Sequence, residues 1–180
     1  AYLAALPGRA EIERRLTELF DYARYSLLEK EGARYFYSKN DGLQNQSVYY
    51  VTDDPRADGR VLLDPNTWSD DGTVALAGTA PSPDGSKVAY LVQDGGSDWR
   101  TVEVIDTATG EKLADRVEWV KFSGLSWAKD GSGFYYSRYP ETSAEEKFTA
   151  LNTNQKVYFH RLGDPQAEDR VIIEDPARPD

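Results

Sequence analysis

Two stretches of the sequence decide the fold: Ser82-Pro83-Asp84-Gly85-Ser86-Lys87-Val88-Ala89-Tyr90 and Ala128-Lys129-Asp130-Gly131-Ser132-Gly133-Phe134-Tyr135-Tyr136. Each places an Asp-Gly turn directly before a run of apolar and aromatic residues that is typical of a β-strand. Gly85 and Gly131 occupy the same position in the two stretches and lie 46 residues apart. A repeat of about 40–50 residues that contains four short strands is typical of β-propeller blades. A β-sandwich with similar turns by chance is the alternative, and the repeat favours the propeller.

Similar β-type runs continue on both sides of these stretches, with turn signals between them. The runs cover residues 35–37, 48–51, 61–63, 74–76, 88–92, 101–105, 117–122, 134–136, 157–159 and 171–173. Because no second strong helical pattern interrupts them, we predict that residues 31–180 are mainly β and antiparallel. At about 45 residues per blade, this region provides about three blades, whereas propellers close with about 4–8. We therefore expect a partial propeller. Either oligomerisation closes the ring or further residues follow Asp180, and we favour the second.

The start of the chain has a different hydrophobic period. Apolar residues recur there at three- and four-residue steps: Ile12, Leu16, Leu19, Phe20 and Ala23. This stripe predicts an amphipathic helix from Pro7 to about Arg24. Such a stripe can bind a partner, but its ordinary use is to dock a helix on its own protein, which we expect here.

Charge and composition exclude several classes of function. The chain has 180 residues with a net charge of −10, and residues 1–40 carry +1, so the β-type region carries the negative charge. This balance argues against binding to a nucleic-acid backbone or to an anionic membrane surface. The absence of cysteine excludes disulfides and thiolate sites. No signal-peptide pattern is visible, and cytoplasm and periplasm both stay open.

The candidate catalytic groups do not form a triad. The one histidine, His160, ends a strand-like run, and we predict a structural role for it. The sequence Gly124-Leu125-Ser126-Trp127-Ala128 lacks the closing glycine of a nucleophile elbow. We interpret three acidic groups as turn formers and not as calcium ligands: Asp53-Asp54, Asp70-Asp71, and Asp94 with Asp98. We therefore expect no catalytic residue, no metal site and no cofactor in this chain.

Several longer motifs resemble the prolyl oligopeptidase (prolyl endopeptidase) family. The similar segments cover residues 16–22, 34–48, 63–66, 69–76, 96–99, 120–127, 136–141 and 154–160. They occur in the order that the family has, and together they extend over the whole chain.

The resemblance implies a serine peptidase that cuts short peptides on the carboxyl side of proline. Such enzymes combine an α/β-hydrolase domain with a seven-bladed propeller that covers the active site. Residues 1–30 would belong with the hydrolase domain, and residues 31–180 would form the first two blades and part of the third. The catalytic Ser, Asp and His would lie downstream of Asp180. The implied partners are short proline-containing peptides and the hydrolase domain of the same protein, in a monomer that binds neither nucleic acid nor membrane.

One residue of the chain is a candidate for substrate binding. In the run Val120-Lys121-Phe122-Ser123, the resemblance implies that Phe122 faces the central cavity and lines the substrate pocket. Packing between blades is the alternative role for Phe122. His160 also matches a family position, but one without a catalytic role. The alternative function for the whole region is a non-catalytic β-propeller that binds peptides or proteins.

Overall fold

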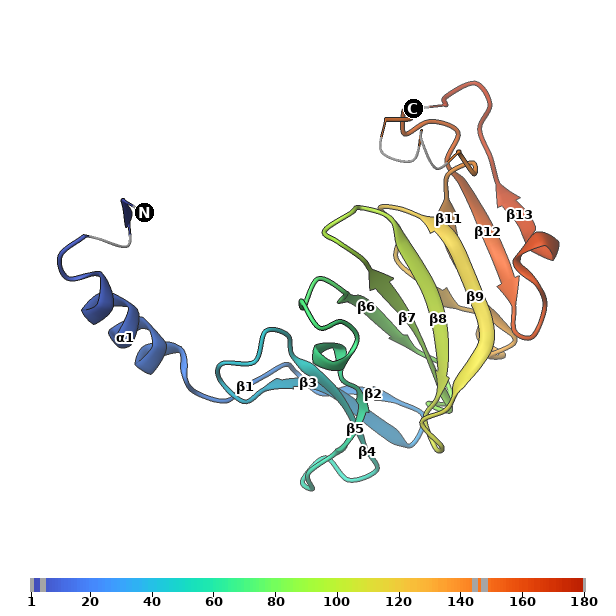
Figure 1. Ribbon diagram of the computed structural model, residues 1–180. Helices are drawn as coiled ribbons and strands as arrows, with labels where there is room; N and C mark the ends of the chain where they lie inside the picture. Colours follow the sequence, from blue (N-terminus) through green and yellow to red (C-terminus); the bar gives the residue numbers. More distant parts are fainter. Residues whose placement is uncertain (1, 4–5, 144–145, 147–148, 180) are drawn as a thin grey trace.

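The computed structural model describes residues 2–3, 6–143, 146 and 149–179, which form one α-helix and three antiparallel strand units (Figure 1). Two short 3-10 helices, η2 (Pro65–Thr67) and η3 (Gln166–Glu168), lie in the connections. The helix, α1, spans Arg9–Phe20. The first unit contains β1 (Arg24–Tyr25), β2 (Glu29–Glu31), β3 (Arg34–Asn40), β4 (Val48–Thr52) and β5 (Arg60–Leu63). The second contains β6 (Ala75–Pro81), β7 (Lys87–Gln93), β8 (Arg100–Asp106) and β9 (Lys112–Val120). The third contains β10 (Ser126–Trp127), β11 (Gly133–Arg138), β12 (Lys156–Arg161) and β13 (Arg170–Ile173).

These units have the strand order of propeller blades, and we call them the first, second and third blade. In the second blade β6, β7, β8 and β9 pair in chain order, and in the third β10, β11, β12 and β13 do the same. One pair, Val120 with Arg138, joins the second and third blades into a continuous curved sheet. The mainly β, partial propeller of about three blades is thereby confirmed. The third blade has four strands and is more complete than the part-blade that the resemblance implied.

The Asp-Gly repeat occupies equivalent turns in two blades. Asp84-Gly85 joins β6 to β7, and Asp130-Gly131 joins β10 to β11. In each turn the Asp Oδ1 accepts a hydrogen bond from the backbone N–H two residues later, at 2.9 Å from Ser86 and 3.0 Å from Ser132. The two glycines have φ values of 69° and 68°, a left-handed conformation that disfavours side chains. The same local chemistry therefore starts the second strand of the second and third blades.

The first strands of the sheet lie earlier in the chain than expected. β1 and β2 fall within residues 1–30, yet both pair with β3, through Arg24 with Asn40 and Glu29 with Phe36. α1 ends at Phe20, because Asp21 leaves the helical conformation with φ −81° and ψ 71°. Arg24 is already extended in the pairing with β3, so the expected helix end near Arg24 is wrong. The sheet therefore begins before residue 31. The association of the helical segment with another domain stays a prediction.

Helix α1 extends away from the blades (Figure 1), and none of its residues is buried. Its apolar stripe is exposed, at 61% for Ile12 and 56% for Phe20. The expectation that this stripe docks on another part of the protein stays a prediction. In the part of the chain that the structure describes, no helix has the length and apolar character needed to cross a membrane.

Two buried hydrophobic clusters hold the blades together. Between the first and second blades, Phe36, Tyr49, Val51, Leu62 and Leu63 pack with Val88, Tyr90 and Ile105. Between the second and third, Ala89, Leu91, Val102, Val104, Val117 and Val120 pack with Phe134 and Tyr136. Each face of the second blade thus contributes alternate residues to a different cluster, as the two-residue period of a strand requires.

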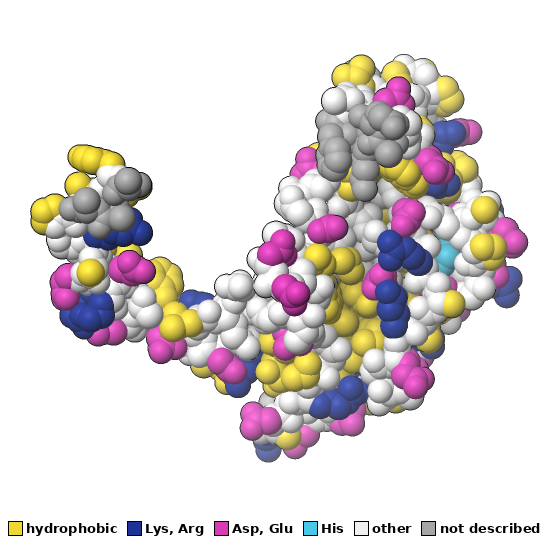
Figure 2. All heavy atoms as spheres, viewed as in Figure 1, with side chains coloured by type: hydrophobic (Ala, Val, Ile, Leu, Met, Phe, Trp, Pro, Cys, Tyr) yellow, Lys and Arg dark blue, Asp and Glu magenta, His cyan; other side chains and the backbone are white. Residues whose placement is uncertain are grey.

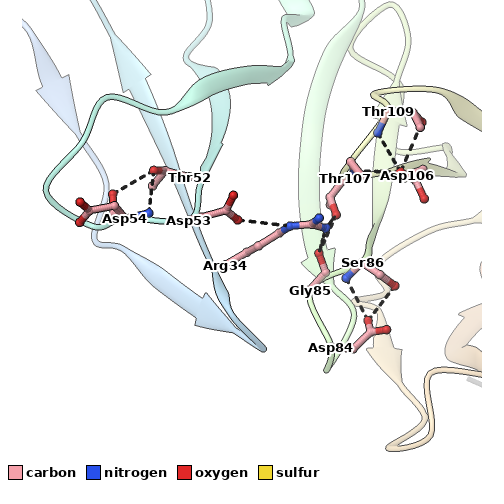
Figure 3. Close-up of polar contacts among 11 residues, drawn as sticks. Arg34, Thr52, Asp53, Asp54, Asp84, Gly85, Ser86, Asp106, Thr107 and Thr109 are labelled. Carbon is pink, nitrogen blue, oxygen red and sulfur yellow. Dashed lines mark hydrogen bonds and ion pairs between the residues drawn. The ribbon is translucent and has the colours of Figure 1, made fainter.

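A polar contact fixes the first blade against the second (Figure 3). Arg34, at the start of β3, donates through Nη1 to the Gly85 carbonyl at 2.8 Å and to the Thr107 hydroxyl. The Arg34 Nε lies 3.6 Å from Asp53 Oδ1. The backbones also approach closely here, because a Cβ atom at Gly32 would clash with the Asp84 carbonyl and one at Gly85 with the Glu31 carbonyl.

We expect Gly85→Ala to destabilise the protein more than Gly131→Ala. Both substitutions force a side chain into a left-handed conformation, which costs about 1–3 kcal/mol. Only Gly85 faces the backbone of another blade, whereas a Cβ atom at Gly131 meets nothing within 4 Å. Urea unfolding followed by tryptophan fluorescence measures both free energies of unfolding. Equal losses for the two variants would contradict the close approach of the blades.

Candidate functional site

The antiparallel strands give the blades two different ends. At one end, which we call the turn end, lie the short connections before β3, β7 and β11. At the other, which we call the loop end, β3, β7 and β11 finish and the chain passes from one blade to the next. The segment that follows α1 also enters β1 at the loop end. The residues that the sequence singled out around Phe122 lie between β9 and β10, and therefore at this end.

Three aromatic side chains form a cluster at the loop end. The ring centroids of Trp99 and Trp119 are 5.5 Å apart, and those of Trp99 and Tyr139 are 6.3 Å apart, both edge to face. Lys121 covers this cluster, with its Nζ 4.7 Å from the Trp99 ring centroid and 5.5 Å from that of Phe122. A cation over an aromatic face is attracted by the ring quadrupole. Lys121 therefore links Phe122 to the aromatic cluster.

Phe122 is 59% exposed and belongs to neither buried cluster. Its φ is 52°, which is rare for a residue with a side chain and costs about 1–3 kcal/mol. Hydrogen bonds on both sides hold this backbone in place. Gln155 Nε2 donates to the Lys121 carbonyl at 3.1 Å, and the Ser137 N–H donates to Ser123 Oγ at 2.8 Å. The backbone thus holds an apolar ring in solvent at the loop end, and substrate contact by Phe122 stays a prediction.

A cleft of about 370 Å³ lies beside the aromatic cluster, on the second blade. Val74, Val92, Trp99, Trp119, Glu103 and Arg116 are among its lining residues. Figure 2 shows hydrophobic side chains in the middle of this part of the molecule, with basic and acidic side chains around them. Glu103 pairs with Lys112 at 2.5 Å and Arg116 at 3.0 Å, and it accepts a hydrogen bond from Tyr90 at 2.8 Å. Burial, together with Glu103, raises the pKa of Tyr90, so this hydroxyl stays protonated.

His160 lies in the structural interior and not at the loop-end site. Its side chain is fully buried, with Nδ1 2.7 Å from Asp169 Oδ1 and Nε2 3.2 Å from Asp115 Oδ1. Burial alone would lower the pKa of His160, but hydrogen bonds with Asp169 and Asp115 and their charges raise it above its ordinary value. Because Asp115 is in the second blade and His160 in the third, the ion pair joins the two blades.

Two of the acidic residues that the sequence offers as calcium ligands, Asp54 and Asp71, accept hydrogen bonds within their own turns. Asp54 Oδ1 accepts the Arg56 N–H at 2.9 Å, and Asp71 Oδ1 accepts the Thr73 N–H at 3.1 Å. Among the residues that the structure describes, no three His, Asp or Glu side chains gather as metal ligands. The side chains that gather around Phe122 at the loop end are aromatic and basic.

Successive four-stranded blades of this kind define the class of the chain, a β-propeller segment with a helical lead-in. The family described as "Prolyl oligopeptidase, N-terminal beta-propeller domain" matches residues 1–180. The chain therefore belongs to the prolyl oligopeptidase family.

Relatives and solved structures agree with this membership. The chain is 40% identical over 174 residues to the prolyl endopeptidase of Elizabethkingia meningoseptica. This alignment covers 96% of this chain and 24% of that protein. A structure from a study of two prolyl endopeptidases and their inter-domain dynamics superimposes with a TM-score of 0.81 at 47% identity, covering 99% of this chain and 25% of that one. The structure of prolyl oligopeptidase B from Galerina marginata, bound to a 35-mer hydrolysis and macrocyclization substrate, superimposes with a TM-score of 0.87 at 29% identity. The match covers 99% of this chain and 27% of that one. The chain thus spans about a quarter of the length of these relatives.

We expect His160→Gln to destabilise the protein by about 3 kcal/mol at pH 6, because the buried Asp115 and Asp169 lose a cationic partner. A histidine whose pKa is raised on folding stabilises the protein below its unfolded pKa, and this contribution is lost as pH rises through the folded pKa. The difference between native protein and variant should therefore shrink at alkaline pH. Urea unfolding at a series of pH values measures it, and a pH-independent difference would disprove the charged pair.

Proposed function

We propose that the protein carrying this chain is a serine endopeptidase that hydrolyses short peptides on the carboxyl side of proline. The propeller region would restrict access to large substrates and form part of the wall of the substrate cavity. The single observation that carries this proposal is the 40% identity to a prolyl endopeptidase over nearly the whole chain. The similar structure of prolyl oligopeptidase B from Galerina marginata, bound to a 35-mer hydrolysis and macrocyclization substrate, supports hydrolysis as the reaction class.

The role that we propose for this chain is substrate positioning. Phe122 would supply an apolar contact for substrate side chains, since its ring is exposed at the loop end and its backbone is held by hydrogen bonds. Such a contact orients the peptide without taking part in bond breaking. The nucleophile, base and acid would come from an α/β-hydrolase domain of the same protein. The exposed stripe of α1 is the surface that we assign to contact with that domain, in a monomeric enzyme.

We expect the full-length protein to cleave a blocked Gly-Pro reporter amide, and a serine-directed inhibitor to abolish the cleavage. A blocked Gly-Ala reporter is the matched control, because it differs at the proline position alone. Release of the reporter group gives the rate for both compounds. Equal rates for the two, or full activity in the presence of the inhibitor, would remove the proposed specificity or mechanism and leave a propeller that binds peptides.

Phe122→Ala should lower kcat/KM for proline peptides by about tenfold, mainly through KM, because the variant loses an apolar substrate contact. The free energy of unfolding should change by less than about 0.5 kcal/mol, since the ring is exposed. Phe122→Leu is the matched variant, which keeps an apolar side chain and should retain most of the affinity. Loss of stability with unchanged KM would instead assign Phe122 to packing between blades.

A further inference from the structure

Two arginines flank the junction between the second and third blades at the loop end. Arg100 is the first residue of β8, and Arg138 is the last residue of β11. Both are paired with Val120, the last residue of β9, one from each side. Three neighbouring strand ends therefore place a guanidinium group on either side of one buried valine.

Both arginines belong to the strand faces that meet between these blades. Along β8, Arg100 shares its face with Val102 and Val104, because side chains alternate along a strand. Along β11, Arg138 shares its face with Phe134 and Tyr136. These four apolar residues form one buried cluster between the second and third blades. The arginines therefore lie at the loop-end edge of that cluster.

Neither guanidinium group has a hydrogen-bond or ion-pair partner among the residues that the structure describes. The Nε atoms of Arg100 and Arg138 are buried and make no hydrogen bond. Neither side chain has an ion pair with a described acid, and the contact of Arg138 is with the Tyr158 ring, 4.4 Å from its centroid. By contrast, Arg34 and Arg116 have carbonyl or carboxylate partners. A buried charged donor without an acceptor is unfavourable, and a bound anion would relieve this cost.

Lys121 adds a third positive charge next to Val120. Its Nζ donates to the neutral Asn152 Oδ1 at 3.0 Å and lies over two aromatic rings, so no described carboxylate neutralises it. Lys121 is thus a further cation at the loop end, beside the exposed Phe122, that no acid among the described residues neutralises. This arrangement favours an anionic ligand, since guanidinium groups match the geometry of carboxylates through paired hydrogen bonds.

We infer that Arg100 and Arg138 form a binding site for a carboxylate group of a peptide. The group is the C-terminal carboxylate or the side chain of an acidic residue. The inference deepens the proposed function and rests on it for the substrate class. Phe122 would contact an apolar part of the same peptide, and the arginines would bind its carboxylate. The enzyme would then prefer peptides that present an acidic side chain, or their own C-terminal carboxylate, to the arginines.

The test compares matched peptides with the full-length protein. One pair of proline peptides differs by a C-terminal carboxylate against an amide, and the other by an internal Glu against Gln. In one of the two pairs we expect the native protein to cleave the carboxylate peptide with a kcat/KM about tenfold higher than that of its neutral match. This factor corresponds to the free energy of one charge-assisted hydrogen bond. The pair that shows the preference identifies the source of the carboxylate. In the double variant Arg100→Gln, Arg138→Gln the ratio within that pair should fall to about one.

Two further variants separate charge from packing. Arg100→Lys with Arg138→Lys keeps the charge and should retain part of the preference. Arg60→Gln, which removes an exposed arginine of the first blade, should leave the preference at its native value. A native ratio near one in both pairs, or a native ratio kept by the double Gln variant, overturns the inference and leaves the proposed function standing.

Failure of the proposed function has a different signature, because then no proline peptide is cleaved at all. In that case tryptophan fluorescence titration with the same uncleaved peptides decides the inference. Binding of a carboxylate peptide about tenfold more tightly than its neutral match, with the difference lost in the double Gln variant, supports the site. Equal binding of the carboxylate and neutral peptides overturns it.

Discussion

The close approach of two turns sets the position of the first blade against the second. Gly32 and Gly85 leave no room for a side chain between their backbones, and Arg34 donates across the same gap to a carbonyl and a hydroxyl. The buried pair of His160 with Asp115 connects the second blade to the third in a comparable way. These contacts, with the buried clusters, hold neighbouring blades against one another, so they help to set where the loop-end residues of one blade lie relative to the next.

Because the blades are held together by these contacts, residues at the loop end can adopt conformations that do not stabilise the fold. Phe122 keeps a left-handed backbone and an exposed ring, and Arg100 and Arg138 keep buried Nε atoms without partners. Each of these features is unfavourable in isolation. Their concentration at one end, with hydrogen-bonded turns at the other, separates the structural contacts of the blades from the surface that we assign to the substrate.

The sequence predicted the features that are determined by residues close together in the chain. It missed the contacts between residues that are far apart in the chain. The Asp-Gly turns, the strand runs and the number of blades follow from local chemistry, and the structure confirms them. The end of the helix was wrong because pairing with β3 overrides the helical period at Arg24. The contacts of Arg34 with Gly85 and of His160 with Asp115 span 51 and 45 residues and have no local signal, since an arginine or histidine in a strand has many possible acceptors. The unpaired state of Arg100 and Arg138 depends on the same long-range register.

The order of contacts along the chain has a consequence for the way in which the protein is made. Each buried cluster joins one blade only to the blade that follows it in sequence. Structures built from such nearest-neighbour contacts can nucleate in one unit and propagate to the next. During synthesis on the ribosome, the first two blades can therefore close on each other before the third has left the exit tunnel, and each new blade folds on a surface that is already formed.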